Sequence, residues 1–322
     1  MYTKEFDGIN SFLVGSCKLL LKEAQARDTR GHKCFELNGP YMFKIKNPCA
    51  RHITIPERKW LKVLPYAESL WIASGRNDIY FINHYLNRMG NYSDNQETMR
   101  GGYGPRIRHF NGSSEDYDHR VISNESEKET DQFRYIVDCF KEDLNTRRAI
   151  IDLGDPMKDC FDSERKLKTT KDIPCTRTLQ FVKQASSDKL DLIVSMRSND
   201  LIYGASAVNI FNYTFMLEYF SSILGLEIGE YIHIANNMHY YEKFDELVRR
   251  IASIEAVEDV GEPLKKTFHS LHEFDELVAK LSKEEEKMRQ DRHNYKEGEM
   301  QDSFFQHWYR VLYDYNMKRF KV

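Results

Sequence analysis

A cysteine and an arginine stand at symmetric positions of a predicted β-hairpin. Residues 176–182 and 190–196 alternate apolar with polar side chains, and the polar residues 186–188 between them have the composition of a turn. A turn centred near Ser186 leaves Cys175 and Arg197 eleven positions away on either side, opposed across the ladder. Opposed side chains lie roughly 5 Å apart at Cβ. Because a guanidinium favours the nucleophilic thiolate, the pair predicts a reactive cysteine.

Charged side chains that precede this hairpin in the sequence have both structural and functional interpretations. Glu68 lies on the margin of the apolar stripe of a helix predicted to end at Gly75, where a carboxylate is a helix-start charge or a functional group. Arg30 falls in the basic stretch 27–33, interpreted as a mobile loop that is either a solvated turn or an anion clamp. Arg147 and Arg148 join a helix to a strand, and they suit solvent, a phosphate dianion or another subunit.

Polar side chains that follow the hairpin could recognise a ligand through hydrogen bonds. The helix that ends before Gly225 is entered through a stretch of small residues after Gly204, and Asn209 there offers both a donor and an acceptor; a helix cap is the structural alternative. The alternating stretch 230–241 predicts one strand with His239 and Tyr241 on the same face. A lone strand histidine is more often structural, and since no second His or Cys is well placed, we expect no metal site.

Composition limits the classes of function. Among 322 residues, 47 basic and 50 acidic side chains give a net charge of −3, so we expect neither a nucleic-acid nor a membrane partner. No apolar run approaches the roughly 20 residues that span a bilayer. The first ten residues lack an apolar signal core, so we expect a cytoplasmic protein. Six scattered cysteines without a CxxC pair argue against a zinc site or a disulfide framework.

The remaining patterns complete a mixed α/β chain. The glycine cluster at 101–106 is interpreted as a tight turn with no helix behind it, and residues 111–130 and 157–171 as loops. We expect a catalytic domain over residues 1–250 and a helical C-terminal extension over 251–322 packed on it. Helices are predicted at 9–26, 66–75, 78–89, 133–144, 271–281 and 304–315, and a strand at 149–153.

Taken in chain order, these features resemble the thymidylate synthase family. The most specific matches lie between the cysteine and the histidine: Pro174-Cys175, Arg197-Ser198-Asn199-Asp200, Asn209-Ile210 after Gly204, and His239-Tyr240-Tyr241 are similar to that family's motifs. Upstream, Glu68, Tyr103-Gly104, Arg147-Arg148 and Arg30 resemble its conserved glutamate, its Tyr-Gly turn, its paired arginines and its phosphate-loop arginine.

The resemblance implies an α/β (α+β) fold of the thymidylate synthase type, a mixed sheet flanked by helices, and transfer of a one-carbon unit from 5,10-methylenetetrahydrofolate to C5 of a pyrimidine nucleoside monophosphate. It also implies a homodimer. In the implied site, Cys175 adds to C6, Glu68 organises proton transfer, and Arg197 favours the thiolate and binds phosphate. Arg30, Ser198 and the partner subunit's Arg147 and Arg148 bind phosphate, Asn209 reads the base, His239 and Tyr241 hold the sugar, and Asp200 and Gly204 contact the folate.

Because a neutral amide at 209 suits uracil, the expected substrate is dUMP, and the reaction that the resemblance first implies is dUMP to dTMP. The alternatives are 5-hydroxymethylation of dUMP, dCMP or CMP and a nucleotide-binding relative without turnover. Several departures from the family bear on this choice. Met196 replaces the usual glutamine, Thr176 the common histidine, and an extra residue separates Gly204 from Asn209. Residues 90–100 lack the usual tryptophans, and helical sequence replaces the closing C-terminal segment.

Overall fold

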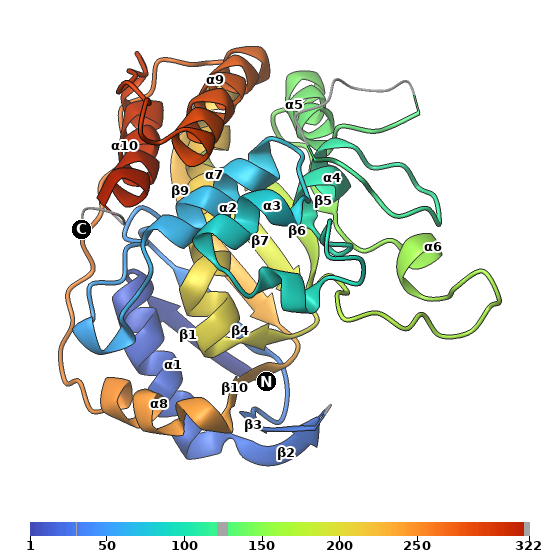
Figure 1. The fold of residues 1–322 in the computed structure, drawn as a ribbon. Coiled ribbons are helices and arrows are strands. Elements are labelled where there is room, and N and C mark those ends of the chain that lie inside the picture. The colour runs from blue at the N-terminus through green and yellow to red at the C-terminus, as the bar shows by residue number, and fades with distance from the viewer. Residues whose placement is uncertain (30, 121–127, 319–322) are drawn as a thin grey trace.

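A mixed β-sheet forms the centre of the molecule (Figure 1). The computed structural model describes residues 1–29, 31–120 and 128–318, and within them six strands follow the order β1-β4-β9-β7-β6-β5. Pairs β1/β4 and β7/β9 are parallel, whereas β4/β9, β6/β7 and β5/β6 are antiparallel. The strands are β1 (Tyr2–Phe6), β4 (Tyr41–Ile45), β5 (Ile150–Asp152), β6 (Thr176–Lys183), β7 (Lys189–Met196) and β9 (Glu227–Ala235). This arrangement, with its helices, confirms the predicted mixed class.

Helix α7 is the most buried helix next to the sheet. Most of its side chains are buried on every side, because it lies between strands β7 and β9 and other helices. It ends at Gly225, whose φ of 66° is the left-handed conformation expected of a glycine cap. Helices α2, α3 and α7 lie in front of the strands in Figure 1. The helices before the C-terminal part are α1 (Ile9–Glu23), α2 (Val63–Ala73), α3 (Ile79–Tyr85), α4 (Tyr103–Arg108), α5 (Gln132–Glu142), α6 (Pro156–Asp159) and α7 (Ile210–Leu224).

A second sheet corrects two predictions. The described part of the basic stretch 27–33 is not a mobile loop, because β2 (Gln25–Thr29) and β3 (His32–Glu36) pair there as antiparallel strands. The predicted strand 230–241 is two strands, since the chain leaves β9 after Ala235 and continues as β10 (Met238–Tyr241) in the second sheet. The order of that sheet is β2-β3-β10-β8, with β8 covering Asn199–Asp200.

The glycine cluster is also different from its prediction. Helix α4 begins at Tyr103, directly after Gly101 and Gly102, so these glycines precede a short helix rather than forming an isolated turn. A Cβ on Gly104 would overlap the carbonyl oxygen of Arg76, which shows how closely α4 approaches the turn after α2. The short 3-10 helices are η1 (Pro56–Arg58), η2 (Met89–Tyr92) and η4 (Glu242–Phe244).

The C-terminal part is helical and closely joined to the rest. Asp259 caps α1 by accepting from the backbone N–H of Asn10 at 2.7 Å, and Glu218 of α7 accepts from Leu264 N–H at 2.7 Å. Trp308 donates its indole N–H to the carbonyl of Tyr66 in α2 at 2.8 Å. The boundary predicted at residue 250 stays a prediction. The helices are α8 (Asp245–Ala252), α9 (Leu271–Gln290) and α10 (Ser303–Lys318). None of the helices in the described ranges is long and apolar enough to cross a membrane.

Candidate active site

Cys175 directly precedes strand β6, where the hairpin places it opposite Arg197. Thr176 pairs with Met196, and Arg197 donates its backbone N–H to the carbonyl of Cys175 at 2.9 Å. The guanidinium folds back, with Nε 3.1 Å from the carbonyl oxygen of Pro174 and Nη2 2.9 Å from that of Ile173. Arg197 therefore holds the backbone that leads to the thiol, in the juxtaposition that hairpin symmetry predicts.

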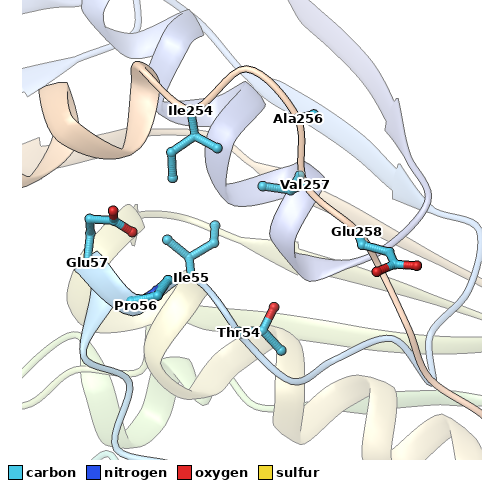
Figure 2. Close-up of a pocket in the computed structure, with 8 residues that line it drawn as sticks. All are labelled: Thr54, Ile55, Pro56, Glu57, Ile254, Ala256, Val257 and Glu258. Carbon is cyan, nitrogen blue, oxygen red and sulfur yellow. The ribbon is translucent and has the colours of Figure 1, made fainter.

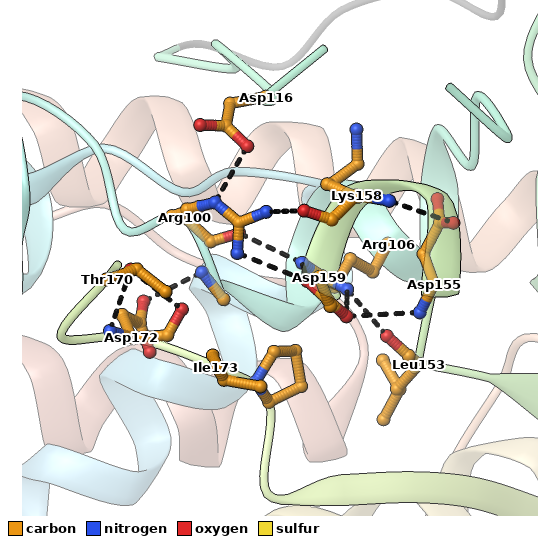
Figure 3. Close-up of polar contacts among 12 residues, drawn as sticks. Arg100, Arg106, Asp116, Leu153, Asp155, Lys158, Asp159, Thr170, Asp172 and Ile173 are labelled. Atoms are coloured by element: carbon orange, nitrogen blue, oxygen red, sulfur yellow. Dashed lines mark hydrogen bonds and ion pairs between the residues drawn. The ribbon is translucent and has the colours of Figure 1, made fainter. Parts of the chain in front are cut away.

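A buried ion-pair network also holds the loop that leads to Cys175 (Figure 3). Asp172 accepts from the backbone N–H of Gly101 at 2.7 Å, and a Cβ on Gly101 would lie only 2.6 Å from that carboxylate. Arg106 of α4, whose side chain is fully buried, bonds both oxygens of Asp159 at 2.7 and 2.9 Å and the carbonyl of Leu153 at 2.9 Å. The network ties α4 to residues 153–172, so the loop before Cys175 is held at both edges.

Three hydroxyls line up beside the cysteine. Thr176 donates its hydroxyl and its backbone N–H to the Tyr103 oxygen at 3.1 and 3.3 Å, and its hydroxyl also lies 2.5 Å from that of Tyr213. Burial and the negative charge of the Cys175 thiolate both raise the pKa of Tyr103. The threonine that replaces the family's histidine thus joins α4 to α7 at the nucleophile.

Glu68 projects from α2 toward this hydroxyl cluster. Its carboxylate accepts a hydrogen bond from Asn212, whose own side-chain oxygen is fixed by Ser69 at 2.8 Å. Burial raises the pKa of Glu68 to about 7, against an ordinary 4.5. Its negative charge in turn raises the pKa of Tyr103 and of Tyr213. A carboxyl that titrates near neutrality beside the nucleophile suits proton transfer.

The entry to α7 is a π-helix, which accommodates the extra residue before Asn209. Residues Leu201–Asn209 form this element, η3, and Ile210 donates its N–H to the carbonyl of Ala205, five residues back. Arg58 bonds the carbonyl of Ile202 at 2.6 Å, and the Trp60 indole N–H bonds that of Ala207 at 2.9 Å. The wider turns of η3 therefore place Asn209 at the start of α7. Arg58 and Trp60, which lie outside η3, donate to carbonyls that these turns expose.

Asp200 and His239 face each other across the second sheet, where β8 pairs with β10. Asp200 caps η3, because its Oδ1 accepts from the N–H groups of Ile202 and Tyr203 at 2.6 and 2.5 Å. Its Oδ2 is buried without a partner among the described residues. Burial raises the pKa of Asp200 and lowers that of His239, whose Nδ1 lies 2.8 Å from Asn237 Oδ1.

Tyr241 ends β10 and Ser198 directly precedes β8, and both are partly buried. The Tyr241 ring contacts that of His239 edge to face at 5.4 Å. Burial raises the pKa of Tyr241, and the charges of Asp200 and Cys175 raise it further, so the second sheet borders the nucleophile. Gly204 lies in η3 against Asn199, whose Oδ1 is 2.5 Å from the position that a Cβ on Gly204 would take.

The structure does not bring Arg147 and Arg148 to Cys175 within one chain. Arg147 and Arg148 are exposed beside the edge strand β5, and Arg148 forms an ion pair with Glu142 at 2.5 Å. Arg30 lies outside the described residues. Arg147 and Arg148 are therefore available to another molecule rather than to the Cys175 site of their own chain.

Two features lie apart from this site. His109, His119 and Glu129 gather three possible metal ligands within 4.8 Å of one another, but the imidazoles stack at 4.3 Å with an angle of 15°, an arrangement that does not aim both rings at one ion. A cavity of about 270 Å³ opens between residues 54–57 and 254–258 (Figure 2). None of the predicted site residues lines it. The expectation of no metal stays a prediction.

Sequence patterns missed Asn199, Asn212 and Tyr213 as neighbours of the site. Asn212 follows Asn209 by about one helical turn, and a polar side chain within a helix buried on most sides is the signal that identifies such a residue. Asn199 occupies the variable position of the Arg-Ser-x-Asp run, which gives no such signal.

Comparison with known proteins agrees with this geometry. A sequence model of the thymidylate synthase family matches residues 16–306. The chain is 32% identical over 241 residues to a deoxyuridylate hydroxymethyltransferase of Bacillus phage SP01, covering 75% of this chain and 59% of that protein. It is 31% identical over 236 residues to a protein of the same name from Pseudomonas phage M6, covering 73% and 60%. A thymidylate synthase of Francisella philomiragia is 24% identical over 200 residues, covering 59% and 65%. The chain spans about three fifths of the length of these phage relatives. Together, the site geometry and the family match show that this chain belongs to the thymidylate synthase family.

Proposed function

We propose that this chain transfers a one-carbon unit from 5,10-methylenetetrahydrofolate to C5 of dUMP and releases 5-hydroxymethyl-dUMP. The observation that carries the proposal is the pairing of Cys175, held by Arg197, with a Glu68 carboxyl whose burial raises its pKa to about 7. The phage relatives named deoxyuridylate hydroxymethyltransferase favour the hydroxymethyl product over the methyl product.

In this proposal the Cys175 thiolate adds to C6 of the pyrimidine, which makes C5 nucleophilic. The folate supplies the methylene carbon that becomes bonded to C5. Loss of the C5 proton and cleavage of the bond between the methylene carbon and the folate nitrogen release tetrahydrofolate and leave an exocyclic methylene. Water adds to that methylene carbon, and loss of the thiolate from C6 restores the ring. The net change replaces C5–H by C5–CH2OH, consumes one water and leaves tetrahydrofolate. Glu68 is the group that passes the protons.

The folate side has features that suit both the cofactor and the entry of water. The buried Asp200 Oδ2 lacks a partner among the described residues, and it can accept from an N–H of a bound heterocycle. Tyr92, the only aromatic residue from 90 to 100, is 47% exposed, so residues 90–100 contribute no buried aromatic ring to this side. Poor exclusion of water supports capture by water over reduction to methyl.

The remaining residues of the proposed site bind the nucleotide. Arg197 and Ser198 bind its phosphate together with Arg30 and with Arg147 and Arg148 of the partner subunit. Asn209 reads the base, His239 and Tyr241 hold the sugar, and Gly204 borders the folate. A homodimer is supported by the exposed position of Arg147 and Arg148, and the expected cytoplasmic location stays a prediction.

The test is the mass of the product. The protein is incubated with 5,10-methylenetetrahydrofolate and dUMP, dCMP or CMP, while dihydrofolate is followed by absorbance. We expect hydroxymethylated dUMP without dihydrofolate. Methylated product with one dihydrofolate per turnover would instead establish thymidylate synthase activity, the second candidate, which the Francisella philomiragia relative supports. A protein that neither turns over nor exchanges the C5 hydrogen of dUMP would be a nucleotide-binding relative.

A further inference from the structure

A chain of buried polar side chains stands behind Asn209. Asn209 donates from Nδ2 to Oδ1 of Asn199 at 3.1 Å, and Asn199 donates from its own Nδ2 to Nε2 of His233 at 3.1 Å. The other ring nitrogen of His233 lies 2.7 Å from the Tyr231 hydroxyl. We call these four residues the amide relay. It joins the start of α7 to strand β9 through β8.

Burial fixes the relay's partners. Asn199 is 2% exposed, and His233 and Tyr231 are fully buried. Burial lowers the pKa of His233 to about 3, so its imidazole is neutral and has one bare nitrogen that accepts from Asn199. If the side-chain amide of Asn209 alone rotated so that its oxygen and nitrogen exchanged places, its Oδ1 would face Asn199 Oδ1. Both atoms are acceptors, so no proton would lie between them. The amide of Asn209 can therefore reverse only if Asn199 reverses with it.

Packing leaves little room for such a reversal. A Cβ on Gly204 would lie 2.5 Å from Asn199 Oδ1 and 3.1 Å from Asn209 Nδ2. The two amides therefore pack directly against Gly204, with no spare space beside their hydrogen bond. On the far side, the His233 ring stacks on Phe43 at 4.7 Å and 13°. Met196, in place of the usual glutamine, approaches Asn209 Nδ2 with its sulfur at 3.8 Å.

We propose that Asn199 and His233 are positioning residues that hold the Asn209 carboxamide with Oδ1 toward the base, and thereby select uracil over cytosine. The inference rests on the proposed function, in which Asn209 meets the base. Uracil presents an N3–H donor beside an O4 acceptor, which match Oδ1 and the second hydrogen of Nδ2, where O4 would replace the weakly accepting Met196 sulfur. Cytosine presents an N3 acceptor beside an amino donor, which require the reversed amide.

The test compares binding of dUMP and dCMP by calorimetry in a matched pair of variants. Asn199→Leu removes the acceptor at similar volume, so the preference for dUMP should fall about tenfold, the size expected for an oriented hydrogen bond. Asn199→Asp keeps an acceptor toward Asn209, and His233 can supply a proton to the second oxygen by changing tautomer. That variant should keep the preference for dUMP. A purely structural role predicts equal losses in both variants and an unchanged ratio.

A second variant guards against misfolding of the first. His233→Phe keeps the ring stacked on Phe43 but frees the Asn199 amide, so the dUMP preference should again fall, with both nucleotides still bound. ¹⁵N spectra of the wild-type imidazole should show Nε2 without a proton. Wild-type discrimination retained in both Asn199→Leu and His233→Phe, or a protonated Nε2, would overturn the relay. Wild-type protein that binds neither nucleotide would instead refute the proposed function.

Discussion

Cys175 lies where an arginine, a threonine and two tyrosines converge on one short segment of backbone. Arg197 holds the residues before it, and Thr176 joins Tyr103 and Tyr213 directly after it. So many anchors on three consecutive peptide units are typical of a side chain whose position matters for chemistry.

The first prediction concerns that side chain. Cys175→Ser should lower exchange of the C5 hydrogen of dUMP by at least ~10³-fold, because a serine hydroxyl is a far weaker nucleophile than a thiolate at neutral pH. Exchange is followed by release of tritium from C5-labelled dUMP. Cys160→Ser, at an exposed thiol outside the site, is the control and should exchange normally. Normal exchange by Cys175→Ser would mean that another group attacks C6.

The second prediction concerns Glu68. Because burial raises its pKa to about 7, the carboxylate that accepts a proton accumulates as the pH rises through 7, so kcat/KM should show a rising limb there. Glu68→Gln should remove the limb and lower kcat ~10²-fold. The exposed Glu57→Gln is the matched control. An unchanged limb in Glu68→Gln would assign it to another group.

The same shift links Glu68 to stability. A folded-state pKa above the ordinary 4.5 means that the folded chain binds this proton more tightly, so the stabilisation is complete below pH 4.5 and is lost as the pH rises to about 7. Glu68→Gln should therefore unfold at higher denaturant concentration than wild type near pH 8, with a smaller gain near pH 5. Urea titrations at both pH values measure this. A gain that does not grow with pH would exclude the linkage.

At the scale of elements, the position of the Cys175 loop depends on α4. Arg106 should therefore be structurally costly to remove, since Arg106→Ala leaves the buried Asp159 carboxylate with one fewer cation. We expect a loss of about 3–5 kcal/mol in the free energy of unfolding, from denaturant titration. Arg120→Ala, which breaks exposed ion pairs only, should cost under about 1 kcal/mol. Similar costs for the two variants would mean that the network does not hold the loop.

Local patterns predicted the elements better than their partners. The hairpin symmetry that placed Cys175 opposite Arg197 is local, and so is the glycine that ends α7. By contrast, alternation identifies strand residues without saying which sheet they join, so it could not separate β9 from β10 at Asn236 and Asn237. Helix α4 was missed for the same reason, because its buried Arg106 finds Asp159 53 residues later. The amide relay joins side chains from three segments, so local sequence patterns could not predict it either.

At the scale of the whole molecule, the main sheet has one buried and one partly exposed face. Side chains alternate along β7 and β9, so that Ile193, Ile232 and Ile234 share the less buried face in register. Met42, on the neighbouring strand β4, is 37% exposed beside them. These four side chains form an apolar patch on a face that also carries the Lys44–Glu230 ion pair. Such a patch suits a second copy of the chain, and it supports the proposed homodimer.

The last prediction tests whether that dimer shares its sites. A chain with Cys175→Ser and a chain with Arg147→Ala and Arg148→Ala should each be nearly inactive alone, because one lacks the nucleophile and the other lacks the arginines for its partner. After joint unfolding and refolding at equal amounts, half of the dimers should be mixed, each with one complete site, so roughly one quarter of wild-type activity should return. Ile232→Glu added to both chains should prevent this recovery by placing like charges in the interface. Arginine variants that remain active alone, or mixtures that recover nothing while size-exclusion chromatography shows mixed dimers, would place these arginines outside the site.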